Sequence, residues 1–339
     1  MTILITGGTG FVGAATVDHL VRSGRTVIVL AAHPAEPGWL PDGIEVTIGD
    51  VRDADGLRVL MTAHRISAVI HAAAITAGPD MEKSHPERIV SVNVGGTAAV
   101  MRAAAEAGCP RVVVASSASV YPLAKADDRR FRADVDPPAP AALYGLTKKM
   151  AEDVARRLGQ VYGIATPILR IAGVYGPYER ETGVREILSA QAQVVADAMA
   201  GQPTRLSRPG FAGWLYSRDA AAGLATLVDA ELAEAAPVFD LGGPEVFSVE
   251  AFCAEIARAF PGWSHAIDAS APTVRYQIPA DRPGSDFERL KAATGFVPRF
   301  GLKAAAADYL AWLAGPEQPL PARGQPCARR GLTAPDSRP

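Results

Sequence analysis

The chain has 339 residues, of which 48% are hydrophobic and 21% are charged, and its formal net charge is −2. This length and composition exclude a disulfide-stabilised mini-protein and a collagen-like chain, and they allow one large α/β domain or a main domain with a smaller partner. The near balance of 34 basic and 36 acidic residues gives no electrostatic reason to expect a nucleic acid as ligand.

Short β-rich runs alternate with alanine-rich, helix-like stretches through the first two-thirds of the chain. The predicted strands are residues 3–6, 26–30, 45–48, 68–71, 111–116 and 164–170. Val- and Ile-rich runs without strict alternation indicate strands that are buried on both faces, and the helices between them indicate parallel connections. The sequence therefore predicts an α/β fold with a Rossmann-type, doubly wound parallel sheet.

The strand–helix rhythm loosens after residue 200, where prolines and turns accumulate. A further helical pattern covers residues 248–260, and Ser248 suits its N-terminus. We expect a dinucleotide-binding Rossmann domain over residues 1–175 and a smaller, mainly substrate-binding lobe over residues 176–314, partly interleaved with it. Residues 315–339 hold six prolines and four arginines but two leucines, which predicts a disordered tail.

A glycine-rich segment, TGGTGFVG at residues 6–13, follows the first predicted strand and opens a helix expected from about residue 13 to 23. Gly7, Gly10 and Gly13 allow a tight turn and let the backbone approach a pyrophosphate, while the helix N-terminus supplies N–H donors for the anion. The segment predicts a dinucleotide site, in which Phe11 and Val12 also contact the cofactor.

The segment that should meet the adenosine ribose lacks its usual carboxylate. An acidic residue about 20 positions after the glycines normally binds the ribose hydroxyls of NAD, but the second strand ends in Ala31-Ala32-His33. The sequence therefore does not decide between NAD and NADP as the cofactor. His33 could contact a 2′-phosphate or be a surface histidine. Asp50, beside Val51 after the third strand, is placed either to accept from an adenine amine or to cap the next helix.

Tyr144 and Lys148 lie four residues apart at the start of a predicted amphipathic helix, whose apolar positions recur at helical spacing from Met150 to Val161. Alone, this pair would fit an ordinary helix surface. An ammonium beside a phenol, however, lowers the phenol pKa from about 10 and makes tyrosine a usable acid/base. Ser117 follows a hydrophobic strand, at the sheet edge where doubly wound folds bind ligands. Together the three residues are the candidate catalytic groups.

Several motifs occur in one order along residues 1–313. They are TGGTGFVG, GDVRD at 49–53, HAAA at 71–74, NVGGT at 93–97, SSASVY at 116–121, YGLTK at 144–148, LRIAGVYGP at 169–177, WLYSRDAA at 214–221 and GFVPRF at 295–300. In these motifs the chain resembles the extended short-chain dehydrogenase/reductase superfamily, specifically its NAD(P)-dependent sugar epimerase/dehydratase branch.

The resemblance implies roles for individual residues. Ser117 would orient the substrate, Tyr144 would be the general acid/base, and Lys148 would bind the nicotinamide ribose and lower the pKa of the tyrosine. Asn93 resembles an asparagine that steadies the central helix, and we also expect it to bind the cofactor. Three further residues would form the wall beside the cofactor: Ala72, Ala73 and Ala74. The resemblance also suggests a homodimer built from the helices after Asn93 and from Tyr144 onward.

Departures from the family pattern narrow the chemistry. Dehydratases of the superfamily carry an Asp-Glu pair just after the catalytic hydroxyl, whereas this chain has Ala118 and Ser119. Dehydration is therefore disfavoured, and Ser119 becomes a candidate substrate contact. Enzymes of nucleotide sugars commonly have an arginine where this chain reads Phe-Ala-Gly-Trp at residues 211–214, so its absence weakens the expectation of a nucleotide sugar.

Three other arginines are candidate substrate contacts. Arg282 resembles a retained phosphate-contacting arginine, or else is an exposed arginine in a proline turn. Arg180 and Arg185 lie in the segment after the strand that should flank the nicotinamide. They could bind a carboxylate or phosphate bidentately, or pair with neighbouring glutamates in a solvated loop.

We expect net epimerisation of a sugar or nucleotide sugar by transient hydride transfer at a carbinol carbon, with Tyr144 exchanging the hydroxyl proton. A second hypothesis is a dehydrogenase or reductase of a non-nucleotide sugar, sugar acid or related alcohol or ketone. A third is a non-catalytic regulator that binds a dinucleotide.

The remaining signals concern location and metals. Cys109, Cys253 and Cys327 form no CxxC pair, and the histidines have no ligand spacing, so neither a disulfide framework nor a metal site is expected. The N-terminus lacks a secretory pattern, and the apolar runs are shorter than a membrane helix requires. We expect a cytoplasmic protein with no membrane partner.

Overall fold

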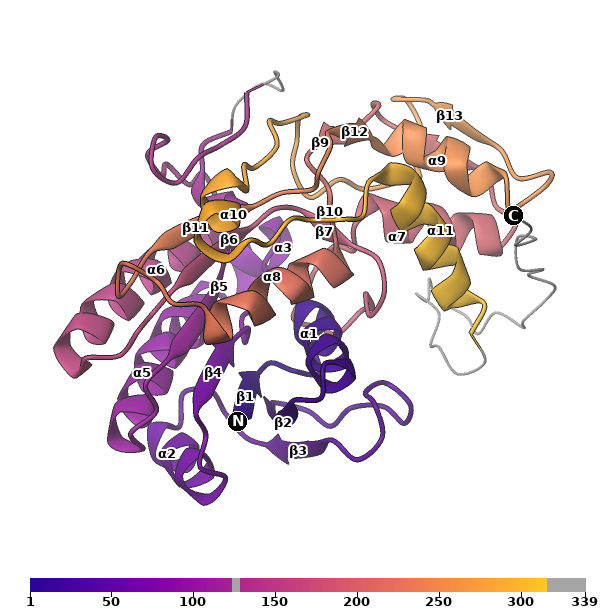
Figure 1. The fold of residues 1–339 in the computed structure, drawn as a ribbon. Helices are drawn as coiled ribbons and strands as arrows, with labels where there is room; N and C mark the ends of the chain where they lie inside the picture. The colour runs from indigo at the N-terminus through magenta and orange to yellow at the C-terminus, as the bar shows by residue number, and fades with distance from the viewer. Residues whose placement is uncertain (124–128, 316–339) are drawn as a thin grey trace.

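The computed structural model describes residues 1–123 and 129–315. Its central sheet consists of β1 (Thr2–Thr6), β2 (Thr26–Ala31), β3 (Glu45–Ile48), β4 (Ala68–His71), β5 (Val112–Ser117), β6 (Ile168–Ile171) and β11 (Val238–Leu241). These seven strands are all parallel, in the order β11-β6-β5-β4-β1-β2-β3 (Figure 1). The winding reverses between β1 and β4. In open α/β sheets the carboxyl ends on either side of such a reversal form the ligand crevice.

All six predicted strands form, with ends shifted by at most a few residues. The sixth begins at Ile168 rather than at residue 164, after Pro167, whose backbone has no N–H to donate to a neighbouring strand. The sequence patterns do not predict β11. It pairs with β6 and brings a segment from beyond residue 175 into the same sheet.

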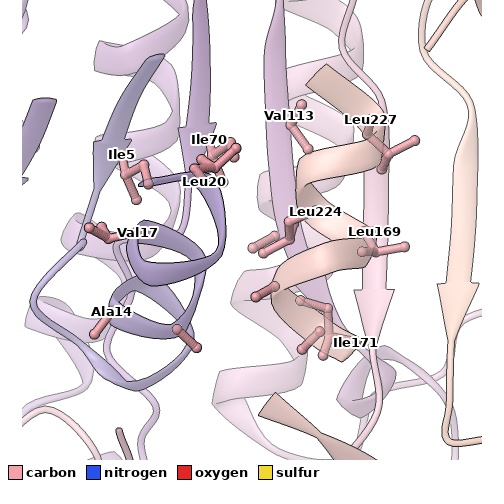
Figure 2. Packing of buried hydrophobic residues seen from close by; sticks show 14 of the residues in the cluster. Ile5, Ala14, Val17, Leu20, Ile70, Val113, Leu169, Ile171, Leu224 and Leu227 are labelled. Carbon is pink, nitrogen blue, oxygen red and sulfur yellow. The ribbon is translucent and has the colours of Figure 1, made fainter. Parts of the chain in front are cut away.

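Helices cover both faces of this sheet. One face carries α1 (Phe11–Arg22) and α8 (Ser217–Asp229), and the other carries α2 (Ala54–Ala63), α5 (Gly96–Glu106) and α6 (Leu143–Tyr162). Along β1, Ile3 and Ile5 belong to the apolar cluster with α1, whereas Leu4 belongs to the cluster with α2 and α5. Figure 2 shows the first cluster, with Leu20 beside Ile70. Burial on both faces accounts for the continuous apolar runs in the sequence.

A second group of elements lies beyond one end of the sheet (Figure 1). It contains β7 (Val174–Tyr175), α7 (Ala190–Met199), β8 (Thr204–Leu206), β9 (Phe211–Ala212), β10 (Leu215–Tyr216), β12 (Phe247–Ser248), α9 (Val249–Ala257), β13 (His265–Ile267) and α11 (Leu302–Leu313). Val194, Phe252 and Tyr309 are part of its separate buried apolar cluster. The predicted helix at 248–260 corresponds to α9, and Ser248 caps it by accepting from the Ala251 N–H at 3.0 Å.

Shorter elements complete the chain: α3 (Pro79–Ser84), α4 (Pro86–Val90), the π-helical turn η1 (Ser91–Gly95), the 3₁₀ turn η2 (Ala118–Val120) and α10 (Glu288–Thr294). The predicted tail lies outside the described residues apart from Gly315. In the described ranges, no helix is long and apolar enough to cross a membrane. The same ranges contain no cluster of three or more His, Cys, Asp or Glu side chains that could hold a metal ion.

Candidate active site

A cavity of about 800 Å³ runs along the carboxyl ends of β1, β4 and β5. One group of lining residues, called here the sheet wall, comes from the glycine-rich turn, the ends of β4 and β5 and the start of α6: Gly7, Gly10, Phe11, Val12, Gly13, Ala72, Ala73, Ala74, Ser117, Ser119, Tyr144 and Lys148. A second group, called the loop wall, comes from loops: His33, Glu36, Arg180, Arg185, Trp214, Tyr276, Gln277 and Arg282. Asp50 and Val51 also line the cavity. The structure thus brings together every predicted site residue except Asn93.

The glycine-rich turn holds the backbone against the cavity. Gly7 has a φ of +74°, and a Cβ there would lie 2.7 Å from the Cα of Ala73. A Cβ on Gly13 would lie 2.1 Å from the carbonyl oxygen of Gly7, so α1 packs on the turn only with glycine at that position. Helix α1 begins without a side-chain cap or an acidic residue in its first turn. Its first N–H groups suit an anion, so the segment fits the pyrophosphate of a dinucleotide.

Asn93 lies behind the cavity rather than on its wall. Its Oδ1 accepts from the backbone N–H of Ile75 at 2.8 Å, and its Nδ2 donates to the Ile75 carbonyl and to Thr147 Oγ1, each at 3.0 Å. The buried amide therefore joins the segment after β4 to α6. Direct contact between Asn93 and a cofactor, as predicted, has no support in this placement, whereas a tie to the helix is what its hydrogen bonds provide.

Tyr144 lies at the start of α6, near the hydroxyls of Ser117 and Thr76. Burial raises the pKa of Tyr144 above its ordinary value, and the effect outweighs the opposing influence of these hydroxyls and of Arg185. The Tyr144–Lys148 spacing predicts that the Lys148 ammonium lowers the pKa of Tyr144. The structure does not show that effect, because the Lys148 ammonium donates to the carbonyl oxygen of Ala115 at 2.7 Å.

Lys148 is buried, and burial lowers its pKa to about 8, while Glu152 one helical turn further on opposes the shift. Behind it, the ring of His71 is hydrogen-bonded to the hydroxyls of Thr6 at 2.8 Å and Thr97 at 3.0 Å. Burial and the Lys148 charge lower the pKa of His71 to about 3. The lysine is therefore flanked by a neutral imidazole at physiological pH.

Ser117 ends β5 with its hydroxyl at the cavity, where it donates to Ser119 Oγ at 3.1 Å and accepts from the Ser119 backbone N–H at the same distance. The short turn η2 follows from this bond, because Ser117 acts as its cap. The Ser117 hydroxyl therefore has Ser119 on one side and the Tyr144 phenol on the other. This arrangement can hold a substrate oxygen next to a group that exchanges its proton.

Two of the three predicted arginines are already paired with carboxylates. Arg180 forms an ion pair with Glu36 and lies over the ring of Trp39, 4.2 Å from its centroid. Arg185 pairs with the fully buried Glu179 at 2.8 Å. The alternative interpretation, pairing with neighbouring glutamates in a solvated loop, gives the correct partner for Arg185, although Glu179 is buried. Arg180 pairs instead with Glu36 of a distant loop.

Arg282 differs from them. Its guanidinium donates to the carbonyl oxygen of Ala118 at 3.0 Å and lies 5.4 Å from the ring centroid of Phe131. Among residues 1–123 and 129–315, no carboxylate forms an ion pair with it at 4.0 Å or less. Burial lowers the pKa of Arg282. It is thus an uncompensated cation on the cavity wall, rather than an exposed arginine in a turn.

The ribose end of the cavity contains one predicted and one unpredicted carboxylate. Asp50 accepts from the side chain and backbone N–H of Arg52, each at 2.9 Å, which holds its pKa low. It does not cap α2, because Asp53 accepts there from the Gly56 N–H at 3.0 Å. The sequence pattern does not predict Glu36, which follows the exposed His33 by three residues, because the carboxylate that binds the ribose is expected at the end of the strand.

Comparisons with known proteins agree with this geometry. The model of the NAD dependent epimerase/dehydratase family matches residues 3–242. The chain is 28% identical to a UDP-glucose 4-epimerase of Neisseria gonorrhoeae, over 92% of this chain and 97% of that protein. It is 34% identical to UDP-glucuronate 4-epimerase 5 of Arabidopsis thaliana, over 53% of this chain and 43% of that protein. The solved structure of MoeE5 in complex with UDP-glucose and NAD is 26% identical with a TM-score of 0.74, over 92% of this chain and 98% of that chain.

Proposed function

This chain belongs to the NAD dependent epimerase/dehydratase family, and on that premise we propose that it is a nucleotide-sugar 4-epimerase with a retained nicotinamide dinucleotide. The observation that carries the proposal is the meeting of Ser117, Tyr144 and Lys148 in one cavity with Arg282, an arginine without a carboxylate partner among the described residues that donates to Ala118 next to Ser117. The UDP-sugar 4-epimerases among its relatives support carbon 4 as the reacting position.

Each part of the cofactor has a binding group in the cavity. The glycine-rich turn would hold the pyrophosphate, Asp50 would hold the adenine, and Lys148 would hold the nicotinamide ribose. The cofactor, when bound, supplies the hydride acceptor and donor. Ser117 would hold the oxygen of the reacting carbinol, and the phenolic oxygen of Tyr144 would take the hydroxyl proton and return it when the other face of the sugar is presented.

Arg282 supports a nucleotide sugar in spite of the missing arginine at residues 211–214. An uncompensated guanidinium in a half-buried wall is stabilised by an anion, and a diphosphate provides oxygens for several charge-assisted hydrogen bonds. Trp214 and Tyr276 also line the cavity and offer apolar surface to a substrate. We assign Arg282 to the diphosphate of the substrate, and Ser119 to the sugar.

Epimerisation is favoured over net oxidation or reduction because two loops that line the cavity are joined to each other. The ion pair of Arg180 with Glu36 joins the loop after β7 to the loop after β2, and both residues line the cavity. Trp39, beneath Arg180, donates from Nε1 to the carbonyl oxygen of Thr9 in the glycine-rich turn at 3.0 Å. These links would retain a dinucleotide through each cycle, as an epimerase requires.

The test is incubation of the purified protein with UDP-glucose or UDP-glucuronate without added cofactor. We expect the 4-epimer of one of them by chromatography and NMR, and a stoichiometric NAD or NADP released on denaturation and identified by mass spectrometry. Free glucose and the Tyr144→Phe variant are the controls, and neither should give an epimer. Turnover only with added dinucleotide would favour the dehydrogenase or reductase, and a protein that binds no substrate but binds a dinucleotide would favour the regulator.

We further propose a homodimer through α6. Part of the apolar surface of this helix is exposed: Met150 and Val161 of the predicted positions are 45% and 54% exposed and the neighbouring Leu146 is 46% exposed, whereas Val154 and Leu158 are partly buried. An apolar stripe left on the surface is typical of an interface between protein copies. Sedimentation equilibrium should give a dimer for the wild type and a monomer for Met150→Glu, whereas Arg156→Glu, off this stripe, should stay dimeric. A monomeric wild type would contradict the proposal.

The proposed division of the chain assigns residues 1–175 to cofactor binding and most of 176–314 to the substrate lobe. Two elements from the second range belong to the first domain, because α8 covers one face of the sheet and β11 adds a strand to it. Cytoplasmic location belongs to the same proposal. It is supported by Cys109 and Cys253, which are buried and unpaired, as is usual for proteins of a reducing compartment.

A further inference from the structure

A row of buried polar side chains crosses three neighbouring strands behind the sheet wall. Ser116 on β5 is level with Arg170 on β6, which is level with Asp240 on β11. Glu152 of α6 and Tyr121, just after η2, complete the row. Apart from Ser116, none of these side chains lines the cavity, so the proposed reaction does not use them directly.

Glu152 is the centre of this row. Its Oε1 accepts from Ser116 Oγ at 2.6 Å and from Arg170 Nε at 2.9 Å, and its Oε2 accepts from the Arg170 terminal nitrogen at 2.8 Å. Arg170 donates onward to the Tyr121 hydroxyl at 2.9 Å, and this hydroxyl donates to Asp240 at 2.7 Å. Each ionisable side chain in the row therefore has at least one hydrogen-bond partner.

The position of Glu152 relates it to the candidate catalytic groups. It lies one helical turn after Lys148 and two turns after Tyr144, so the three share one face of α6. Its partner Ser116 immediately precedes Ser117. The hydrogen bond between Ser116 and Glu152 thus joins the helix that carries the acid/base to the strand that carries the substrate-orienting hydroxyl.

Stability alone is a poor explanation for such a pair. Removing two charges from water is costly, and well-packed apolar side chains of similar volume often stabilise a protein as well or better. Both Glu152 and Arg170 are almost fully buried, at 2% and 4% exposure. Their occurrence directly behind Ser117 and Lys148 indicates a contribution to the geometry and charge of the site.

We propose that Glu152 is a positioning residue of this site, which locks the helix of Tyr144 and Lys148 against the strand of Ser117 and supplies the counter-charge of the Lys148 ammonium. This inference rests on the proposed function, because it assigns Glu152 a part in the same reaction. Arg170 holds the carboxylate in place through two hydrogen bonds.

The surroundings of Lys148 determine what loss of the carboxylate should do. Tyr144 and Glu152 face it from α6, His71 faces it from β4, and Arg170 lies behind Glu152 on β6. The imidazole is neutral, so Glu152 is the group that favours the ammonium form. Without it, Lys148 should lose its proton at a lower pH, and turnover should fall with it.

The experiment compares Glu152→Gln, the charge-balanced double variant Glu152→Gln/Arg170→Met, and Tyr121→Phe as a matched control. The double variant keeps the proposal testable if the unpaired Arg170 prevents Glu152→Gln from folding. The control removes a hydroxyl of the same row and leaves the bonds of Glu152 intact. Two readouts are taken: the pH profile of kcat, and the NMR titration of the Lys148 ε-carbon, assigned with Lys148→Met.

We expect the alkaline limb of kcat and the Lys148 titration to move to lower pH by about one unit in both Glu152 variants, with kcat at pH 8 several-fold lower. Tyr121→Phe should lose stability and keep both wild-type midpoints. Wild-type midpoints in the folded double variant would overturn the proposal. If the wild type turned over no nucleotide sugar, the proposed function would fail, whereas the lysine titration would still test the role of Glu152.

Discussion

The two walls of the cavity are held in different ways. On the sheet wall, side chains are fixed by short bonds to nearby backbone, as Lys148 is to Ala115. On the loop wall, Arg180 is held by an ion pair with Glu36 from a distant segment, and Arg282 has no carboxylate partner among the described residues. A proton-transfer step needs constant geometry, whereas admitting a substrate and retaining a cofactor need groups that can exchange partners. Substitutions in the sheet wall should therefore lower kcat or stability, and those in the loop wall should alter KM or cofactor residence.

The largest expected effect is on the sheet wall. Tyr144→Phe removes the group that exchanges the substrate proton and leaves the ring in place. We expect kcat to fall roughly 100- to 10,000-fold, while the dinucleotide content, measured after denaturation, stays at the wild-type level. Near-wild-type turnover would contradict the assignment of Tyr144, and loss of the dinucleotide would mean that the phenolic hydroxyl also supports cofactor binding.

The loop wall should respond in KM. Arg282→Met removes the uncompensated cation, and we expect KM for the nucleotide sugar to rise roughly 10- to 100-fold with a small change in kcat, because a charge-assisted hydrogen bond contributes about 1.5–3 kcal/mol. Arg289→Met is a matched control, since Arg289 pairs with Glu234 away from the cavity. An unchanged KM in initial-rate measurements would remove Arg282 from the substrate site.

Cofactor residence should depend on the Arg180 link. Arg180→Ala removes the pairing with Glu36 and the contact with Trp39, and we expect the dinucleotide to dissociate about 3- to 10-fold faster, a modest change because Glu36 is largely exposed to solvent. Glu36→Gln should behave similarly and kcat should hold. Exchange of labelled dinucleotide measures the rate; equal rates in all proteins would show that the loops do not retain the cofactor.

The smallest effect concerns the pH dependence of stability. Burial raises the pKa of Asp240 to about 7, so the folded protein binds a proton that the unfolded chain has lost above about pH 4. Stability from this group is present below that pH and is lost as the pH rises toward 7. In urea titrations, Asp240→Asn should gain on the order of 1–3 kcal/mol relative to wild type between pH 5 and 8. A difference that is constant with pH would contradict this assignment.

Local sequence patterns predict the residues of the sheet wall, but they do not predict which side chains pair on the loop wall. The glycine-rich turn and the Tyr144–Lys148 spacing are short-range signals of backbone geometry and helix periodicity. The partnership of Arg180 with Glu36 joins residues 144 positions apart, and no local pattern predicts it. Strand β11 was missed for a related reason: four residues following a proline give too short an apolar run to separate from the lobe.

Helix α6 shows where hydropathy misleads. Its period was predicted correctly, but the face turned to the sheet carries Lys148 and Glu152, while the apolar Met150 is exposed. Buried ionic groups are stable there only because Ala115, Ser116 and Arg170 satisfy them. Those partners come from β5 and β6, which are distant in sequence, so only the folded structure identifies the inward face of α6.

The most direct test of the account follows the hydrogen at carbon 4. UDP-glucose deuterated at that carbon is incubated with the protein and excess unlabelled NAD, and the product is analysed by NMR and mass spectrometry. An epimerase with a retained cofactor returns the same hydrogen, so the 4-epimer should keep its deuterium at carbon 4 and free NADH should carry none. Deuterium in free NADH, with a keto sugar as product, would contradict the account and identify a dehydrogenase.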